Sequence, residues 1–164
     1  MPAARSVGLR AAGFTIIELL ITVAIVSILA SAALPMAEMT VRRTREQDLR
    51  QSLREIRVAL DKHKQAWDSG HILKKSGDSG YPRTLEVLVE GVVDAKSPTG
   101  AKIYFLRRLP HDPFAATANV PAGSTWGKRS YASPPDDPKE GDDVFDVYSL
   151  SDGIGMNGVP YREW

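Results

Sequence analysis

Glu18 is the residue whose surroundings most clearly suggest chemistry, because it is a carboxylate at the beginning of a long apolar run. From Leu19 to Ala37 the chain carries no charged residue. An acid in an apolar membrane segment usually has a partner, although its free-energy cost is smaller near the end of the segment than at the centre. Glu18 therefore either pairs with a positive charge, which it attracts strongly in a low-dielectric layer, or reaches the membrane surface without a partner.

Oxygen-bearing side chains and glycines alternate in residues 151–158, near the C-terminus. Such spacing permits tight turns that direct carbonyl groups inward, as in calcium-binding loops. Asp152 and Asn157 are the side-chain candidates for a calcium site, and the further candidates are Ser149, Leu150, Ser151, Asp142 and Asp143. Because calcium takes about six to eight oxygen ligands, two side chains are too few to form a calcium site by themselves. The favoured alternative is an Asx and glycine turn whose side chains bond to their own backbone.

The apolar run that follows Glu18 is long enough to cross a membrane. About twenty mostly apolar residues span a hydrocarbon core as a helix, and residues 14–37 reach that length. The thirteen residues before them carry Arg5 and Arg10 and no acid. The positive-inside rule then predicts a cytoplasmic leader and sends everything after Leu34 across the membrane.

Two simpler interpretations of this segment are a cleaved secretory signal peptide and an uncleaved signal anchor. Residues 30–32, Ala-Ser-Ala, are small enough to resemble a signal-peptidase site. The apolar stretch is too long for a typical signal peptide, however, and the helical pattern continues beyond Pro35. A signal anchor would fit a periplasmic binding module that does not polymerise.

The junction and the apolar run together resemble a type IV prepilin. Gly13, Phe14, Glu18 and a late Pro35 match that pattern. The resemblance implies that a prepilin peptidase cleaves after Gly13 and methylates the new amino terminus at Phe14, while the helix is kept. It also implies that Glu18 pairs with the amino terminus of a neighbouring subunit. Pro35 has no backbone N–H and its ring crowds the preceding turn, so we expect a kink or a locally melted helix near Ser31.

Motifs in the remaining chain resemble the major, G-type pseudopilin of type II secretion systems. In order, they are Gly80-Tyr81-Pro82, Tyr104-Phe105-Leu106, Pro110-His111-Asp112-Pro113-Phe114, Trp126-Gly127-Lys128-Arg129-Ser130-Tyr131, Asp146-Val147-Tyr148-Ser149-Leu150 and Trp164. The family binds calcium in its C-terminal loop, but Asn157 stands here where the family has acidic residues.

This second resemblance implies a structural subunit, not an enzyme, that polymerises into a periplasmic pseudopilus and drives export of folded proteins across the outer membrane. It places the chain in the bacterial inner membrane as a single-pass protein with a periplasmic C-terminal domain. Its expected partners are copies of itself, minor pseudopilins, the inner-membrane assembly platform with its ATPase, the prepilin peptidase and membrane lipid. A type IV pilus or DNA-uptake subunit is the alternative, which the lack of cysteine disfavours.

Composition leaves little room for other functions. The 164 residues carry a net charge of +1, which fits one small domain plus a membrane segment and gives no electrostatic argument for nucleic acid. His63, His71 and His111 lack the spacing of zinc ligands. The residue types of a catalytic triad are present in Ser124, His111 and Asp112, but no catalytic motif connects them. We therefore expect no enzymatic activity.

The elements that position these residues follow from hydrophobic periodicity. We expect a leader over 1–13, a membrane helix over 14–37, an amphipathic helix over 38–69 and a loop and sheet domain over 70–164. The helix should bury one face, made of Leu49, Leu53, Ile56, Leu60, His63 and Trp67. Charged residues such as Arg42 and Glu46 are expected on its exposed faces.

The C-terminal part should add a short helix and a small antiparallel sheet. Thr84 is the expected cap of a helix over 84–88, and residues 103–106 should be largely buried. Residues 127–132 and 144–150 should pair as antiparallel strands. The predicted fold is α+β, a pilin-like lollipop in which a long N-terminal helix packs on a small sheet.

Overall fold

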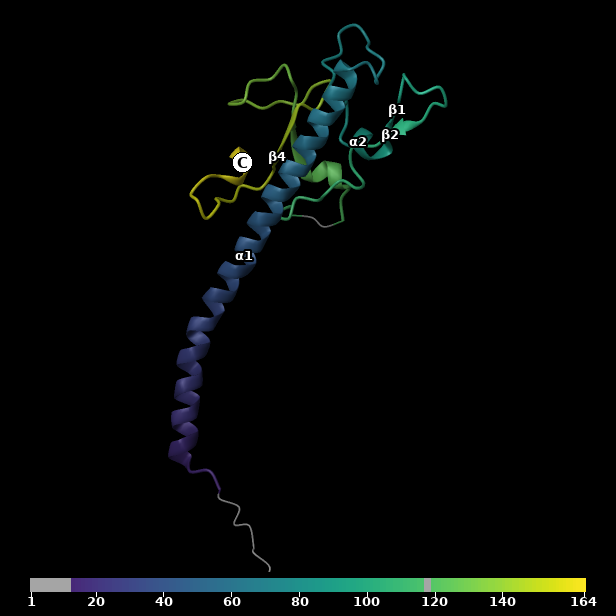
Figure 1. The fold of residues 1–164 in the computed structure, drawn as a ribbon. Coiled ribbons are helices and arrows are strands. Elements are labelled where there is room, and N and C mark those ends of the chain that lie inside the picture. The colour runs from purple at the N-terminus through teal and green to yellow at the C-terminus, as the bar shows by residue number, and fades with distance from the viewer. Residues whose placement is uncertain (1–12, 117–118) are drawn as a thin grey trace, which may run out of the picture. The chain divides into compact units, whose positions relative to one another are not determined.

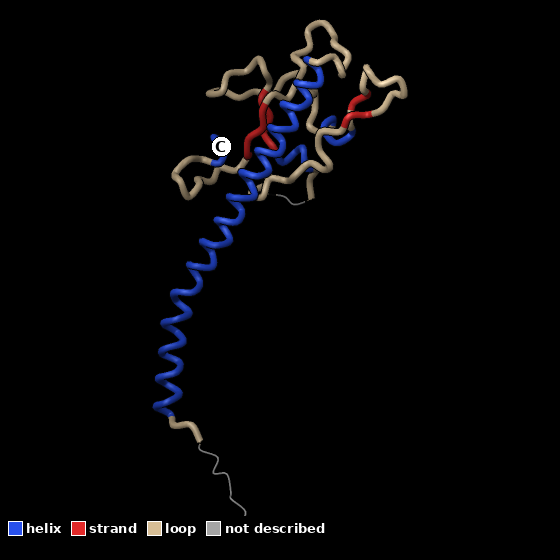
Figure 2. Tube along the Cα trace, in the orientation of Figure 1, coloured by secondary structure: helices blue, strands red, loops and turns tan. Residues whose placement is uncertain are grey.

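The structure is a computed structural model that describes residues 13–116 and 119–164. The predicted leader therefore lies outside the described residues, apart from Gly13. The chain divides into two compact units, one ending at Val41 and the other comprising Arg42–Trp164. The fold is α+β, as predicted, and the described residues form one long N-terminal helix and two small antiparallel sheets, where the sequence predicts one sheet (Figures 1 and 2).

The long helix α1 runs from Ile16 to Asp68. It begins after Thr15, whose side-chain Oγ1 accepts a hydrogen bond from the Glu18 amide at 3.2 Å. It ends where Gly70 takes a positive φ of 78°, a backbone conformation that favours glycine and closes many helices. The Gly70 amide donates to the Trp67 carbonyl and the His71 amide to the Ala66 carbonyl. The predicted end of the helix is therefore confirmed.

Pro35 lies inside α1, and the helix continues past it without a break. The local melting that the sequence predicts near Ser31 is thus not present in this structure. Pro35 cannot donate to the carbonyl four residues earlier, but the helical hydrogen bonds on either side hold the surrounding turns. The Ser31 hydroxyl donates to the Ile28 carbonyl at 2.7 Å.

Hydroxyl side chains in the apolar half of α1 bond to the helix itself. Thr22 donates to the Leu19 carbonyl at 2.9 Å and Ser27 to the Val23 carbonyl at 2.7 Å. Such back-bonding satisfies a hydroxyl without water. These polar residues are therefore compatible with a hydrocarbon environment, in which an unsatisfied donor would be costly.

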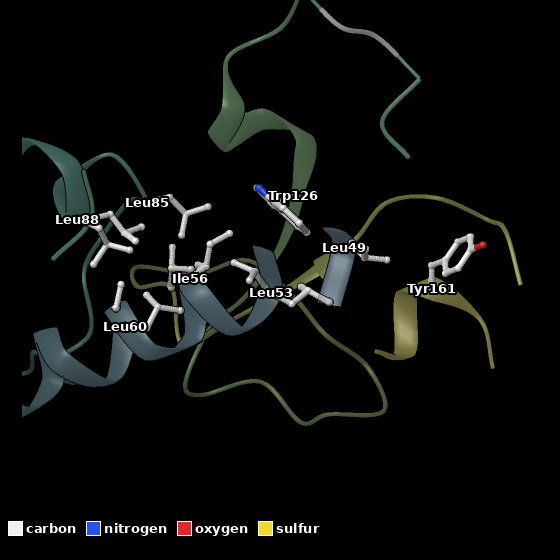
Figure 3. Close-up of a cluster of buried hydrophobic side chains, with 12 residues drawn as sticks. Leu49, Leu53, Ile56, Leu60, Leu85, Leu88, Trp126 and Tyr161 are labelled. Atoms are coloured by element: carbon white, nitrogen blue, oxygen red, sulfur yellow. The ribbon is translucent and has the colours of Figure 1, made fainter. Parts of the chain in front are cut away.

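The second unit is built around the predicted stripe of α1. The buried side chains of this stripe are Leu49, Leu53, Ile56, Leu60 and His63, while Trp67 is half-buried. The four aliphatic residues of this stripe form one cluster with Leu85, Leu88, Trp126 and Val147 (Figure 3). Burial of each such apolar side chain contributes about 1.5–3 kcal/mol, so this face of α1 organises the unit.

Two short antiparallel pairs make up the sheets. β3 (Trp126–Arg129) pairs with β4 (Asp146–Ser149), with Trp126 opposite Ser149. This confirms the predicted pairing, although both strands are shorter than expected because the chain turns away after Arg129 and before Asp146. β1 (Val92–Val93) and β2 (Lys102–Ile103) form a second pair that the sequence did not predict. Two short 3₁₀ helices cover Ala122–Thr125 and Tyr161–Glu163.

The short helix α2 spans Val87–Glu90, later than predicted, and Thr84 does not cap it. The amides of Leu88 and Val89 bond to carbonyls three residues earlier, so the preceding turn is too tight for an α-helix. Leu85 and Leu88 are nonetheless fully buried, as predicted. The expectation for residues 103–106 was wrong at Tyr104, which is 64% exposed because this short segment buries Leu106 instead.

Candidate functional site

The predicted processing junction lies in an open, non-helical segment. Gly13, Phe14 and Thr15 precede the first turn of α1. The Phe14 side chain is 82% exposed, and a side-chain carbon placed at Gly13 would meet no atom within 4 Å. A protease needs an accessible peptide outside regular structure, and the Gly13–Phe14 bond meets this requirement.

Glu18 occupies the first turn of α1 and is exposed. Thr15 and Glu18 stand at the spacing of a capping box, and the Thr15 hydroxyl accepts from the Glu18 amide. Among the residues that the structure describes, the Glu18 carboxylate makes no hydrogen bond or ion pair. The helix dipole favours an acid at this end, so the position is stable and the carboxylate remains available to a cation.

The helical surface on both sides of Glu18 is predominantly apolar. Its exposed large side chains are Ile16, Ile17, Leu19, Leu20, Ile21, Val23, Ile25, Val26, Ile28, Leu29, Met36 and Met39. By length and composition α1 is the one described helix able to cross a membrane. A helix that is apolar on every face needs a membrane or other helices around it. The N-terminal helix is therefore suited to membrane anchoring.

The C-terminal loop does not bring its predicted ligands together. Ser149 is fully buried, and its Oγ donates to Asp112 Oδ2 at 2.6 Å. The Asn157 Oδ1 accepts from the Val159 amide at 3.1 Å, which is the Asx turn of the favoured alternative. Asp152 and Leu150 are exposed. No group of three or more metal-binding side chains occurs among residues 13–116 and 119–164.

Asp143, one of the additional candidates for calcium, is engaged within the protein, while Asp142 is exposed. Asp143 Oδ1 accepts from the Ser130 hydroxyl at 2.7 Å and from the Tyr131 amide at 2.9 Å, while its other oxygen accepts from Ser79. Burial raises the pKa of Asp143, but these hydrogen bonds outweigh burial and hold the pKa below its usual range. Asp143 thus closes the turn that follows β3. The residues present do not fit a calcium ion.

Glu46 is a site residue that lies elsewhere than the sequence predicts, whereas Arg42 is exposed as expected. Glu46 was expected on an exposed face, but it is only 3% exposed. Its Oε1 accepts from the Met156 amide at 2.9 Å and from the Tyr161 hydroxyl at 3.0 Å. The periodicity could have indicated the burial of Glu46, since Glu46 precedes the buried Leu53 by seven residues, two turns back along the same helical face.

Residues 9–34 match a family model described as the prokaryotic N-terminal methylation motif. The match includes Gly13, Phe14 and Glu18 and ends just before Pro35. No curated protein and no solved structure matches the chain. The motif is that of type IV pilin-like precursors, so it supports a pilin-like subunit. Such a motif implies processing by a prepilin peptidase and polymerisation into filaments.

Proposed function

We propose that this chain is a structural pseudopilin, which polymerises into the periplasmic pseudopilus of a type II secretion system. The filament would drive export of folded proteins across the outer membrane. The observation that carries the proposal is the exposed Gly13–Phe14 junction directly before an apolar helix whose first turn holds Glu18. The methylation motif over residues 9–34 supports the pilin-like part of the proposal.

Processing is the first step. The prepilin peptidase cleaves the peptide bond after Gly13 and methylates the nitrogen of Phe14, which leaves a charged amino terminus four residues before Glu18. The mature helix stays in the bacterial inner membrane, with the leader cytoplasmic and the C-terminal domain periplasmic. The two arginines of the leader support this orientation.

Assembly is the second step, and Glu18 is the residue that sets the axial offset between neighbouring subunits. A carboxylate in an apolar layer attracts the ammonium group of another subunit much more strongly than it would in water. When helices of successive subunits pack, only one axial offset places the Glu18 of one copy beside the Phe14 amino group of its neighbour. Minor pseudopilins, the assembly platform and its ATPase are the further partners of this step.

Pro35 fits a role in adapting the helix during assembly. In this structure α1 is unbroken, although the proline leaves the carbonyl of Ser31 without its usual donor. The turn around Ser31 is therefore the weakest part of the apolar helix. We expect it to unwind when subunits pack in a filament, because neighbouring helices then replace the bilayer around it.

The choice of a secretion system rests on the motifs of the second unit. The Gly80-Tyr81-Pro82 block contacts α1, because the Gly80 carbonyl accepts a hydrogen bond from His63 Nδ1 at 2.9 Å. Asp112 of the Pro-His-Asp-Pro-Phe block bonds to Ser149 of the Tyr-Ser-Leu block. The blocks that resemble the G-type pseudopilin are thus mutual contacts of one folded unit. A type IV pilus or DNA-uptake subunit is the alternative.

Intact mass and N-terminal sequencing test the processing step. We expect protein from membranes of cells with a prepilin peptidase to begin at N-methylated Phe14. A Gly13→Leu variant should remain uncut, because the bulky side chain blocks the peptidase. An uncut wild-type chain, or cleavage after Ala32 or Ala33, would instead indicate an anchored or secreted binding module.

Deletion of the gene tests which machine uses the subunit. A pseudopilin of a secretion system predicts that exported proteins accumulate in the periplasm while surface pili remain. Loss of pili, twitching or DNA uptake with normal secretion would assign the chain to a pilus. Complementation with the wild-type gene is the control.

A further inference from the structure

We propose that the C-terminal loop, residues 150–160, is held to α1 by a cluster of Arg42, Glu46 and Tyr161, and that it needs no calcium ion. We call these three residues the Glu46 cluster. The proposal concerns the folded second unit alone and does not depend on filament assembly. It departs from the calcium site that the resemblance to G-type pseudopilins implies.

The Glu46 carboxylate is the centre of the cluster. It is almost fully buried, yet it receives hydrogen bonds from the Met156 amide at 2.9 Å and the Tyr161 hydroxyl at 3.0 Å. Arg42 lies 3.5 Å from the same carboxylate and Arg50 lies 4.0 Å from it. A buried carboxylate requires such partners, and one of them is the backbone of the loop itself.

Arg42 adds the positive charge that a calcium ion would otherwise bring. Its guanidinium donates to the Ile154 carbonyl of the loop, and its Nε donates to the Tyr161 hydroxyl at 3.4 Å. A loop carbonyl that accepts from a guanidinium has a cationic partner already. The i,i+4 spacing of Arg42 and Glu46 places both charges on the same face of α1.

Backbone groups of the loop are satisfied by the loop itself. Gly155 donates to the Val159 carbonyl at 2.8 Å and Gly158 donates to the Gly155 carbonyl at 2.9 Å. The Tyr161 amide donates to the Gly153 carbonyl at 3.0 Å. The carbonyls of Gly153, Gly155 and Val159 therefore already accept hydrogen bonds, and Asp152 alone cannot supply the charge that calcium needs.

Aromatic packing holds the other side of the cluster. The Tyr161 ring stacks on Phe114 with centroids 4.2 Å apart and meets Trp164 edge-on at 5.1 Å. The guanidinium of Arg50 lies 4.1 Å from the centre of the Trp164 ring. Tyr161 is thus fixed by packing, which orients its hydroxyl toward Glu46 at little further entropic cost.

Calcium dependence of the wild-type protein is the first test. The full-length chain in detergent micelles is melted with excess calcium chloride and, separately, with a calcium chelator, and hydrogen exchange of the Met156 amide is followed under both conditions. We expect the same melting temperature and the same protection of Met156. A chelator-induced fall in either quantity would overturn the proposal, and this result needs no variant.

Matched substitutions on α1 and in the loop give the second test. Glu46→Ala should lower the melting temperature by about 5 °C or more and deprotect Met156, whereas Glu55→Ala, at an exposed position of the same helix, should change neither. Asp152→Ala should also be silent. If Asp152→Ala destabilises the protein only when calcium is present while Glu46→Ala does not destabilise it, the ion and not the cluster holds the loop.

Discussion

Ser149 Oγ donates a hydrogen bond of 2.6 Å to Asp112 Oδ2, and both side chains are buried. The second carboxylate oxygen of Asp112 accepts from the Phe114 amide at 2.8 Å. The Ser149 hydroxyl also accepts from the Ser151 amide at 3.1 Å. One carboxylate and one hydroxyl thus connect the Pro-His-Asp-Pro-Phe turn, the end of β4 and the start of the C-terminal loop.

Asp112→Ala and Ser149→Ala should each destabilise the protein by about 1–3 kcal/mol, because each leaves a buried polar partner unsatisfied. The free energy of unfolding is measured by urea denaturation of the full-length protein in micelles, with tryptophan fluorescence as the signal. The double variant should lose less than the sum of the two single variants. Ser124→Ala, at an exposed serine, is the control, and strict additivity would mean that the two side chains do not interact.

Stability should fall as the pH drops below about 6.5, the ordinary pKa of histidine, because of His63. Burial lowers the pKa of His63, although its bond to the Gly80 carbonyl acts in the opposite direction. The unfolded chain then binds a proton that the folded protein does not, so the free energy of unfolding decreases with falling pH. The measurement is urea denaturation at about pH 7.5 and about pH 5.5.

His63→Gln isolates this contribution, because glutamine can still donate to the Gly80 carbonyl but does not titrate. The loss of stability between the two pH values should be smaller in this variant than in the wild type. His111→Gln, at an exposed histidine, should leave the loss unchanged. An equal loss in the wild type and in His63→Gln would assign the pH dependence to other groups.

Ile56→Ala should lower the free energy of unfolding by about 2–5 kcal/mol, because Ile56 is fully buried in the core cluster. Val58 lies on the same helix but is 50% exposed. The free energy of unfolding of Val58→Ala should therefore stay within about 0.5 kcal/mol of the wild-type value. Urea denaturation of the two variants measures the difference. If both variants lost a similar free energy of unfolding, Ile56 would not lie on the buried face of α1.

Most of α1 could be predicted from the sequence, because a long periodic stripe is a strong signal. The period from Leu49 to Leu60 identified the buried face, and the expected end at residue 69 lies next to the observed end at Asp68. Glu46 was misassigned because composition suggests that an acid is exposed, whereas its partners Met156 and Tyr161 are about 110 residues away in sequence. The local sequence therefore does not show which distant residues pair with Glu46.

The loops and short strands were less predictable for the same reason. β1 and β2 contain two residues each, which is too short for an alternating pattern. Val87 begins α2 because Leu85 and Leu88 must both reach the core, and packing overrides the capping preference of Thr84. At the loop of residues 151–158, the Asx turn was identified, but the Glu46 cluster that holds the loop was not.

Glu18→Ala should abolish incorporation into filaments without unfolding the second unit. In the proposed assembly the Glu18 carboxylate pairs with the amino terminus of a neighbour in a low-dielectric layer, where loss of one charge leaves the other unpaired. Filament yield is measured by crosslinking between subunits in the membrane and immunoblotting, or by secretion of an exported protein. The melting temperature of the purified variant shows whether the fold is intact.

Thr15→Ala separates this assembly role from helix capping. Thr15 and Glu18 share the first turn of α1, and the hydroxyl of Thr15 accepts from the Glu18 amide. Loss of that bond should destabilise the helix end by about 1 kcal/mol, while the carboxylate remains in place. We therefore expect Thr15→Ala to assemble at near wild-type yield. Equal defects in the two variants would make capping the function of both residues, and normal filaments from Glu18→Ala would exclude the proposed pairing.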